Sequence, residues 1–346
     1  GREPGATPVS EWRTSDRASF RAAGELEHRA VDAWWQLGTE RVWPRRIDIL
    51  KSKRKTAVCR LAGAGPEGEA VIAKRCRSET ARVECVIYEE LFPRLPIPAL
   101  RCYGFLREPE GRYCWLFLEE ACGGEYSPLI GEHRLLAGQW LAAVHAASLQ
   151  AGLCARLPAR EPDHYLESLR SSREAILQHL SGGKPEMEEA GFLEGIVACC
   201  GVIESHWEEL ERACEGVPRA LVHGDLVVKN VRVRRRPAGA GVLVFDWENA
   251  GWGVMATDFA QFTGRTLSPD LPAYCSAVNG GPLELGLERI RQLAVCGRLF
   301  RLIDDLRWAS SSLAGQPQEN LVRPLSQLRH YGCWMSDSLR AARWTG

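Results

Sequence analysis

The sequence lacks the features that would assign it to a nucleic-acid-binding or membrane class. Its 346 residues carry 44 Lys and Arg against 44 Asp and Glu, so no net charge attracts nucleic acid or an anionic lipid surface. No apolar run approaches the ~18–20 residues that a membrane-spanning helix needs. The polar N-terminus has no apolar stretch of the kind found in signal peptides. We therefore expect neither nucleic acid nor a membrane as a partner, and the oligomeric state stays open.

Cysteine spacing typical of zinc sites or disulfide frameworks is also missing. The 13 cysteines are an odd number, no C-x-x-C occurs, and Cys199 and Cys200 are adjacent, which suits neither zinc nor an ordinary disulfide. Others lie in apolar settings, such as Cys85 and Cys114. We expect buried free thiols that act as small apolar side chains. Such thiols are typical of a reducing, cytoplasmic compartment.

Two segments of different character follow each other along the chain. After a helix expected over residues 16–38, short apolar strands and turns run to residue 119, with one more helix expected over 79–92. That helix has apolar residues every four positions, at Val83, Ile87 and Leu91, and ends at a proline-rich stretch. Further on, helical periodicity dominates, apart from two strands within 221–246. The pattern predicts an α+β protein with a β-rich lobe over 1–119 and a larger, mainly helical lobe over 120–346.

The stretch 221–230, LVHGDLVVKN, places a carboxylate and an amide among apolar residues. Asp and Asn are common turn residues, so Asp225 and Asn230 alone indicate little. The strands NVRVRR and GVLVFD that follow are joined by a Pro/Gly turn, and a hairpin of this kind returns Asp246 beside Asn230. Oxygen ligands such as these suit Mg²⁺. A carboxylate that the metal does not need can accept the proton of a hydroxyl nucleophile, as in phosphoryl transfer.

The β-rich lobe contains a lysine and a glutamate at a spacing suited to nucleotide binding. Lys74 ends the strand AVIAK, and Glu84 lies at the edge of the apolar face of the helix expected over 79–92. In kinases, a lysine held by a glutamate contacts the nucleotide phosphates. Glu89 is an alternative partner for the lysine, and a solvated surface carboxylate is a third interpretation.

These motifs, in this order and spacing, resemble those of the aminoglycoside phosphotransferase and choline kinase family, which has a protein-kinase-like fold. The family pattern is close to H-G-D-x-x-x-x-N, followed downstream by D-W/F-E and then by G-x-x-x-x-D. The matching residues are His223, Gly224, Asp225, Asn230, Asp246, Trp247, Glu248, Gly253 and Asp258. The resemblance spans roughly residues 45–265. It implies a bilobal protein-kinase-like fold, with a small β-rich N-terminal lobe that contains one key helix and a larger, mainly helical C-terminal lobe.

The resemblance also implies roles for individual residues. Asp225 would be the catalytic base that orients and deprotonates the acceptor hydroxyl. Asn230 and Asp246 would bind Mg²⁺. Lys74 would contact the α- and β-phosphates of ATP, or of GTP, and Glu84 would orient Lys74.

The resemblance also implies how the catalytic loop is braced and where the adenine binds. Asp258 would brace the catalytic loop through backbone N–H groups. His223 is itself interpreted as a structural histidine of that loop, with a role as acid or base as the alternative. The connector near residues 118–122, which includes Glu119, would hold the adenine through backbone hydrogen bonds.

The chain departs from related patterns at the turn expected over the phosphates. This turn, KSKRKT, contains no glycine, unlike the glycine-rich loop of protein kinases. Ser52, Thr56 or backbone amides could contact the phosphates instead, with the basic residues 51 and 53–55 supplying charge; a solvated turn is the alternative. The segment LVVKN also differs from the LHPGN-like form common in the family.

The acceptor site carries the weakest motifs. The side chains of Trp247, Trp252 and Trp308 could enclose a quaternary ammonium by cation–π contact, or belong to the core. Asp304 and Asp305 could receive a cationic acceptor, or lie on a solvated helix face. An aminoglycoside, an amino alcohol, a sugar or a natural product with a hydroxyl group all remain open as the small-molecule acceptor.

The sequence therefore predicts a Mg²⁺- and ATP-dependent phosphotransferase that acts on the hydroxyl of a small molecule. A nucleotide-binding pseudokinase or scaffold is an alternative, although such a protein does not need Lys74, Asp225, Asn230 and Asp246 together. A protein kinase is a second alternative. HGD in place of HRD and DWE in place of DFG favour a small-molecule kinase.

Overall fold

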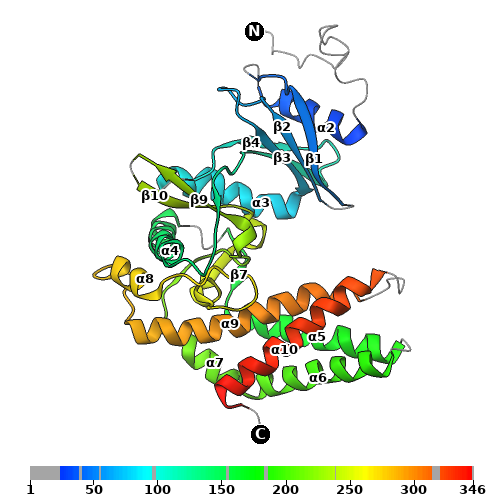
Figure 1. The fold of residues 1–346 in the computed structure, drawn as a ribbon, viewed down its shortest axis with the longest axis vertical. Coiled ribbons are helices and arrows are strands. Elements are labelled where there is room, and N and C mark those ends of the chain that lie inside the picture. The colour runs from blue at the N-terminus through cyan, green and yellow to red at the C-terminus, as the bar shows by residue number, and fades with distance from the viewer. Residues whose placement is uncertain are drawn as a thin grey trace. The chain divides into compact units, whose positions relative to one another are not determined.

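The computed structural model (Figure 1) describes residues 24–38, 41–53, 56–95, 99–152, 156–182, 186–237, 239–313 and 320–344. The chain divides into two compact units. The first contains residues 1–93, 98–123 and Leu243–Glu248, and the second contains 94–97, 124–242 and 249–346. The segment around Asp246 is thus part of the first unit, while Asp225 and Asn230 belong to the second.

The first unit is built on an antiparallel sheet with the strand order β1-β2-β3-β5-β4. Its strands are β1 (Arg46–Lys53), β2 (Thr56–Ala62), β3 (Val71–Arg77), β4 (Cys102–Arg107) and β5 (Tyr113–Glu119). Residues alternate between the two faces of a strand, so Cys59 and Leu61 of β2 point to the same side as the buried Trp34 of α2 (Glu25–Gln36). Trp34 packs on Phe117 with ring centroids 5.3 Å apart. Residues 16–23 of the helix expected over 16–38 lie outside the described residues.

The helix expected over 79–92 is present, but its geometry changes along its length. An α-helix, α3 (Ser78–Val86), continues as a π-helical turn over Ile87–Leu91 and a 3₁₀ turn over Phe92–Arg94. Ile87 and Leu91 are fully buried, as the four-residue spacing indicates. Pro93 in the last turn cannot donate a backbone hydrogen bond, which accounts for the end of the helix there.

The second unit is mainly helical. Its helices are α4 (Gly131–Ala151), α5 (Pro162–Gly182), α6 (Met187–Ser205), α7 (Trp207–Cys214), α8 (Leu271–Val278), α9 (Leu287–Ser310) and α10 (Val322–Ala342). Helix α9 packs against α5, α7, α8 and α10, and Figure 1 shows it running through the middle of these helices. Phe300 of α9 is fully buried and stacks on Tyr165 of α5 with ring centroids 4.3 Å apart. Apolar burial on several sides makes α9 the core helix of this unit.

Two small sheets accompany these helices. One has the order β10-β9-β6, and the other has the order β7-β11-β8. Their strands are β6 (Gly124–Glu125), β7 (Ala159–Arg160), β8 (Arg219–Val222), β9 (Val231–Arg236), β10 (Gly239–Val244) and β11 (Gly251–Val254). Strands β9 and β10 are the hairpin that the sequence predicts after Asn230. Short 3₁₀ turns at Val228–Asn230, Trp247–Asn249 and Met255–Phe259 connect these strands to the rest.

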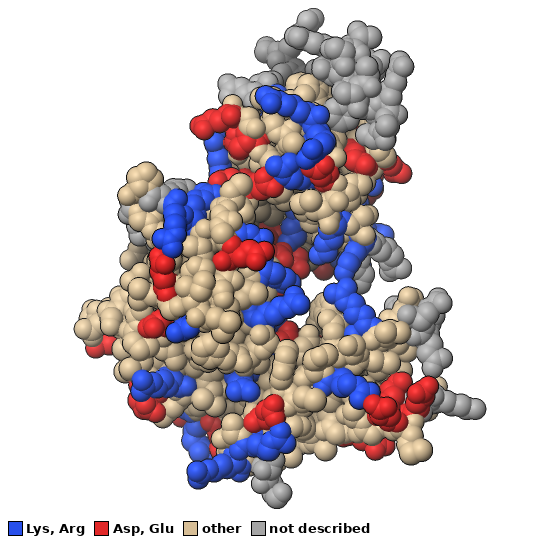
Figure 2. Space-filling model, in the orientation of Figure 1, with Lys and Arg blue, Asp and Glu red and all other residues tan. Residues whose placement is uncertain are grey.

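The charge balance and the cysteine content of the sequence agree with the surface charges and the free thiols of the structure. On the face shown in Figure 2, Lys and Arg side chains are interspersed with Asp and Glu side chains. In the described part of the chain, twelve cysteines are free thiols and none is bridged. Six of these are buried, as expected from their apolar settings. None of the helices described is long and apolar enough to cross a bilayer.

Helix α9 lies against the 3₁₀ turn Met255–Phe259 at a glycine. A Cβ atom added at Gly297 would overlap the backbone carbonyl oxygen of Ala256. The clash is with backbone, which cannot move aside as a flexible side chain would. Gly297 therefore sets how closely α9 approaches this turn.

We expect Gly297→Ala to cost about 1–3 kcal/mol of stability, the usual penalty for overpacking. This corresponds to a fall in Tm of at least ~2–4 °C for a unit of this size. Gly201→Ala is the matched control, because Gly201 is also helical but has open space around its Cα. There, alanine should raise stability by up to about 1 kcal/mol. Thermal melting followed by circular dichroism distinguishes the two; a Gly297→Ala variant as stable as the wild type would contradict the close approach.

Candidate functional site

The first unit contains a nearly buried lysine in contact with three carboxylates. The Lys74 side chain on β3 is only 10% exposed. Its Nζ lies 3.1 Å from Glu84 Oε2, 2.5 Å from Asp246 Oδ1 and 3.0 Å from Glu248 Oε2. The contact expected between Lys74 and Glu84 is therefore present, and Glu89 is not the partner. Glu248 belongs to the recognised motif, but sequence reasoning gave it no role.

Glu84 connects this lysine to the turn after β10. It lies on α3 with no exposed surface, and its Oε1 accepts a hydrogen bond of 3.1 Å from the backbone N–H of Trp247. Asp246, directly before Trp247, has a φ of 68°, in the left-handed region that Asp tolerates better than most residues. Phe92 packs edge-on against Trp247, with ring centroids 5.4 Å apart, which assigns Trp247 to the core.

The electrostatics of this cluster favour a cation in addition to Lys74. Burial raises the pKa of Glu84 to about 7, an effect that Lys74 opposes and that Asp246 and Glu248 reinforce. Burial lowers the pKa of Lys74, but the three carboxylates outweigh it and raise this pKa well above its usual value. Lys74 thus stays charged, and three carboxylates around one ammonium leave surplus negative charge. A divalent cation bound through carboxylate oxygens would neutralise it.

Removing the ammonium should destabilise the first unit in a pH-dependent way. In Lys74→Met, the pKa of Glu84 would rise further above 4.5, its ordinary value. A carboxyl group with a raised pKa in the folded state loses stabilising free energy as the pH rises through that pKa. We therefore expect a small loss at pH 5 and about 3–5 kcal/mol at pH 8, the usual cost of breaking a buried ion pair.

Thermal melting of Lys74→Met at both pH values tests this expectation. Lys53→Met, at an exposed position of β1, is the matched control and should melt like the wild type. The double variant Lys74→Met/Glu84→Gln should regain part of the stability lost at pH 8. An equal loss at pH 5 and pH 8 would show that Glu84 is not ionised beside Lys74.

In the second unit, a tightly braced loop carries Asp225. Gly224 has a φ of 77°, and a Cβ added there would overlap the backbone oxygen of Asn249, so the turn requires glycine. Asp258 Oδ2 accepts a 3.0 Å hydrogen bond from the backbone N–H of His223. The Nδ1 atom of His223 in turn accepts a 3.2 Å bond from the N–H of Asp225. The expected contacts of Asp258 and His223 with this loop are therefore present.

The Asp225 carboxylate has donors on both oxygens. Asn230 Nδ2 donates to Oδ2 at 3.1 Å and also to the backbone oxygen of Asp225 at 3.0 Å. Lys229 Nζ lies 3.3 Å from Oδ2. Arg301 of α9 donates from Nη2 to Oδ1 at 2.7 Å. The predicted proximity of Asp246 to Asn230 concerns residues of different units and stays a prediction.

Sequence reasoning missed Arg301. The side chain is only 12% exposed, and its guanidinium also donates to Gly224 and Asp305. The sequence gives only a weak indication of its role. It is an arginine four residues before Asp305, in a helix with many buried apolar positions. Nothing in the local sequence indicates contact with Asp225, which lies 76 residues away.

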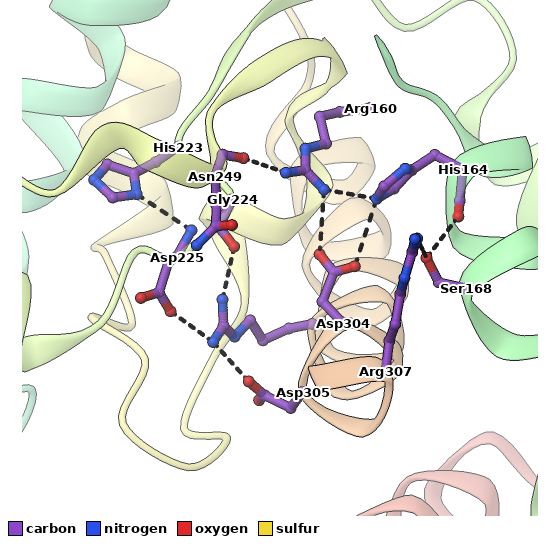
Figure 3. A network of polar contacts seen from close by, with 11 residues as sticks. Arg160, His164, Ser168, His223, Gly224, Asp225, Asn249, Asp304, Asp305 and Arg307 are labelled. Atoms are coloured by element: carbon purple, nitrogen blue, oxygen red, sulfur yellow. Dashed lines mark hydrogen bonds and ion pairs between the residues drawn. The ribbon is translucent and has the colours of Figure 1, made fainter. Parts of the chain in front are cut away.

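The two candidate acceptor carboxylates already have cationic partners from the chain (Figure 3). Asp305 Oδ1 accepts from Arg301 Nη2 at 2.7 Å. Asp304 lies 3.7 Å from Arg160 and 3.5 Å from His164. Neither is the solvated carboxylate of the alternative interpretation, and a cationic acceptor would have to compete with these partners.

The structure also locates the remaining residues predicted to contact the acceptor, the phosphates or the adenine. Trp308 on α9 is 54% exposed, and Trp252 on β11 pairs with Leu221 of β8. Ser52 and Thr56 flank the turn between β1 and β2, while residues 54 and 55 of the basic turn lie outside the described residues. Glu119, at the end of β5, accepts a 3.1 Å hydrogen bond from the backbone N–H of Arg101.

The carboxylate oxygens near Lys74 can be compared with the ligands that the predicted Mg²⁺ site needs. Within the described ranges, no group of three or more His, Cys, Asp or Glu side chains has the arrangement of a metal site. Asp246 and Glu248 beside one shared lysine are nevertheless the kind of oxygen donors that Mg²⁺ takes together with phosphate and water. The chemistry of these residues therefore fits a nucleotide-bound Mg²⁺ rather than a metal held by protein ligands alone.

Comparison with known proteins gives matches in family and fold. A family model described as the phosphotransferase enzyme family matches residues 60–290. No curated protein sequence matches the chain.

Several solved structures are similar over most of their length. A variant of an aminoglycoside 2'-phosphotransferase in complex with GDP aligns with a TM-score of 0.61 at 12% identity, over 92% of this chain and 99% of that one. Choline kinase from Cryptosporidium parvum aligns with a TM-score of 0.55 at 13% identity, over 90% and 93%. A microcompartment-associated aminopropanol kinase aligns with a TM-score of 0.56 at 15% identity, over 86% and 93%. These similarities confirm the predicted protein-kinase-like α+β fold.

Proposed function

Because the chain belongs to the phosphotransferase enzyme family, we propose that it transfers the γ-phosphate of Mg²⁺-bound ATP to a hydroxyl of a small molecule. The family match confirms the predicted phosphotransferase class, and within it the proposal is a small-molecule kinase. The observation that carries the finer proposal is the Asp225 carboxylate. It is fixed by a glycine turn and by donors from Asn230 and Arg301, as a base that must meet a hydroxyl in one orientation requires.

The proposed reaction is an in-line displacement. The acceptor oxygen forms a bond to the γ-phosphorus, and the bond from that phosphorus to the β,γ-bridging oxygen breaks, so that ADP leaves with its electron pair. The hydroxyl proton passes to Asp225. Lys74, oriented by Glu84, would contact the α- and β-phosphates. Asn230 and Asp246 would hold Mg²⁺, which supplies charge neutralisation at the phosphates when it is bound. Residues 1–119 form the nucleotide lobe in this proposal, and 120–346 form the catalytic and acceptor lobe.

The adenine is assigned to the connector that begins at Glu119. The backbone N–H groups of Glu119 and Glu120 donate to the carbonyl oxygens of Arg101 and Ala70. Among the described residues, no backbone oxygen accepts a hydrogen bond from the N–H of Ala121, so it is the donor that we assign to the adenine. Ser52 and Thr56 are proposed phosphate contacts at the turn between β1 and β2. Solved neighbours in complex with GDP and with ADP support a nucleotide but leave ATP and GTP both open.

The acceptor remains a class of compounds. One solved neighbour is a spectinomycin phosphotransferase in complex with ADP and spectinomycin, and another is an aminopropanol kinase. These two neighbours support the proposal that the acceptor is a small, polar compound with a hydroxyl group. An ATP-consumption screen of the wild type against aminoglycosides, amino alcohols, sugars and homoserine identifies the acceptor. The free thiols of the chain support a reducing, cytoplasmic setting.

Replacing the proposed base should remove turnover but spare the nucleotide. We expect Asp225→Asn to lower kcat by about 10²–10⁴-fold, the usual contribution of general-base catalysis. Affinity for ATP, measured by calorimetry, should stay close to that of the wild type. Asp163→Asn, at an exposed position in the first turn of α5, is the control and should turn over normally. Full turnover in Asp225→Asn would refute the mechanism, and ATP binding without turnover by the wild type would favour a pseudokinase.

The metal role of Asp246 is tested with asparagine, which also tolerates the left-handed backbone of this position. The substitution removes the charge and keeps the turn, whereas alanine would add strain. We expect Asp246→Asn to weaken Mg²⁺-dependent ATP binding by at least about tenfold, or ~1.4 kcal/mol. Binding measured without Mg²⁺ should change less. Equal ATP affinities of variant and wild type in the presence of Mg²⁺ would exclude this role.

A further inference from the structure

We propose that Arg301 is a positioning residue for the catalytic carboxylate of Asp225, and that Asp305 holds Arg301 in place for this task. The inference rests on the proposed function, because it concerns the same reaction. Arg301 Nη1 donates to the backbone oxygen of Gly224, and Nη2 donates to Asp225 Oδ1 and Asp305 Oδ1, each at 2.7 Å. One guanidinium therefore binds both the backbone and the side chain of the loop.

Burial makes this contact strong and specific. The side chains of Arg301 and Asp225 are 12% and 15% exposed, and charged groups so far removed from water need ionic partners. Burial lowers the pKa of Arg301, but Asp305 and Asp225 outweigh it, so this pKa lies above its usual value. Burial also raises the pKa of Asp305, which Arg301 opposes. Arg301 is thus a permanent cation beside the base.

The donors around Asp225 also indicate where a hydroxyl could bind. A carboxylate offers about four acceptor positions, two on each oxygen. On Oδ2, Asn230 and Lys229 occupy two of them. On Oδ1, Arg301 occupies one, and the described residues leave the other open. The acceptor hydroxyl is therefore assigned to Oδ1, the oxygen that Arg301 holds.

The backbone frame around Arg301 fixes its position relative to the loop. Gly297, Arg301 and Asp305 follow each other at intervals of four, so they lie on one face of α9. Gly297 brings that face against the turn Met255–Phe259. Asp258 of this turn holds the backbone of His223, two residues before Asp225. Helix, turn and catalytic loop thus form one connected frame.

A positioning role differs from a purely structural ion pair in that its loss lowers kcat and leaves nucleotide binding intact. The cations in contact with this carboxylate are Arg301 on α9 and Lys229 on its own loop. Arg301 is the most buried cation in direct contact with it. Without Arg301, this carboxylate keeps Asn230 and Lys229 on Oδ2 but loses the donor that orients Oδ1, so we expect turnover to fall while nucleotide binding is kept.

The test compares Arg301→Gln with Arg301→Lys by following ATP consumption with the acceptor found by screening, or with water as the acceptor. We expect Arg301→Gln to lower kcat about 10–100-fold, the loss of charge-assisted hydrogen bonds, with KM for ATP nearly unchanged. Arg301→Lys keeps the charge and can still donate to Oδ1, so it should recover part of kcat.

Two further variants make the result specific. Arg307→Gln is the matched control: Arg307 lies on the same helix, but its guanidinium donates to Ser168, and activity should be unchanged. In the Asp225→Asn background, adding Arg301→Gln should lower kcat no further, because the group to be positioned is absent. A merely structural role would make the two losses multiply.

Failure of the inference and failure of the proposed function give different results. If the wild type does not turn over ATP, or if Asp225→Asn is fully active, the proposed function fails and the role of Arg301 fails with it. If Asp225→Asn is inactive while Arg301→Gln has wild-type kcat, only the role of Arg301 is refuted. An Arg301→Gln variant that is more active than the wild type would also refute it, since the arginine would then obstruct the base.

Discussion

The need to match buried charge governs the arrangement of functional side chains in both units. Removing an ammonium or a guanidinium from water costs several kcal/mol unless carboxylates replace the lost hydration. Lys74 satisfies this requirement through Glu84, Asp246 and Glu248. Because these carboxylates come from a helix and from the segment after β10, one lysine ties three parts of the first unit together. The cluster is therefore structural and functional at once.

The second unit solves the same problem with an arginine. A guanidinium has five N–H donors in a fixed plane and stays charged at every relevant pH. Arg301 uses this geometry to bind a backbone oxygen and two carboxylates. A lysine has a single charged nitrogen and could not reproduce this set of directions. The cationic partners of Asp304 and Asp305 also argue against a simple acidic pocket for a polycation.

The sequence was a good guide where function depends on short-range pattern. The strand that ends at Lys74 and the helix that carries Glu84 are adjacent in the chain, so their contact followed from local elements. The hairpin after Asn230 was likewise readable from two apolar strands and a turn. In the same way, the spacing around HGD and DWE was enough to indicate the family, which the family model confirms.

The sequence failed where contacts depend on how distant helices pack. Glu84 was placed at the edge of an apolar face, whereas it is completely buried and accepts a hydrogen bond from the backbone of Trp247, 163 residues away. Arg301, Asp304 and Asp305 lie in a helix, and their partners include residues around 160, 164 and 224. Helical periodicity identifies which residues share a face but cannot tell which distant loop that face meets.

The four-residue spacing of Gly297, Arg301 and Asp305 has a consequence for how the length of this protein can vary. Each residue of an α-helix turns the chain by about 100°. One inserted or deleted residue between Gly297 and Arg301 would therefore swing the guanidinium to another side of α9 while Gly297 kept the helix in place. A change of length outside α9 would leave the relative directions of these three residues unchanged. A change of length within this turn would alter them.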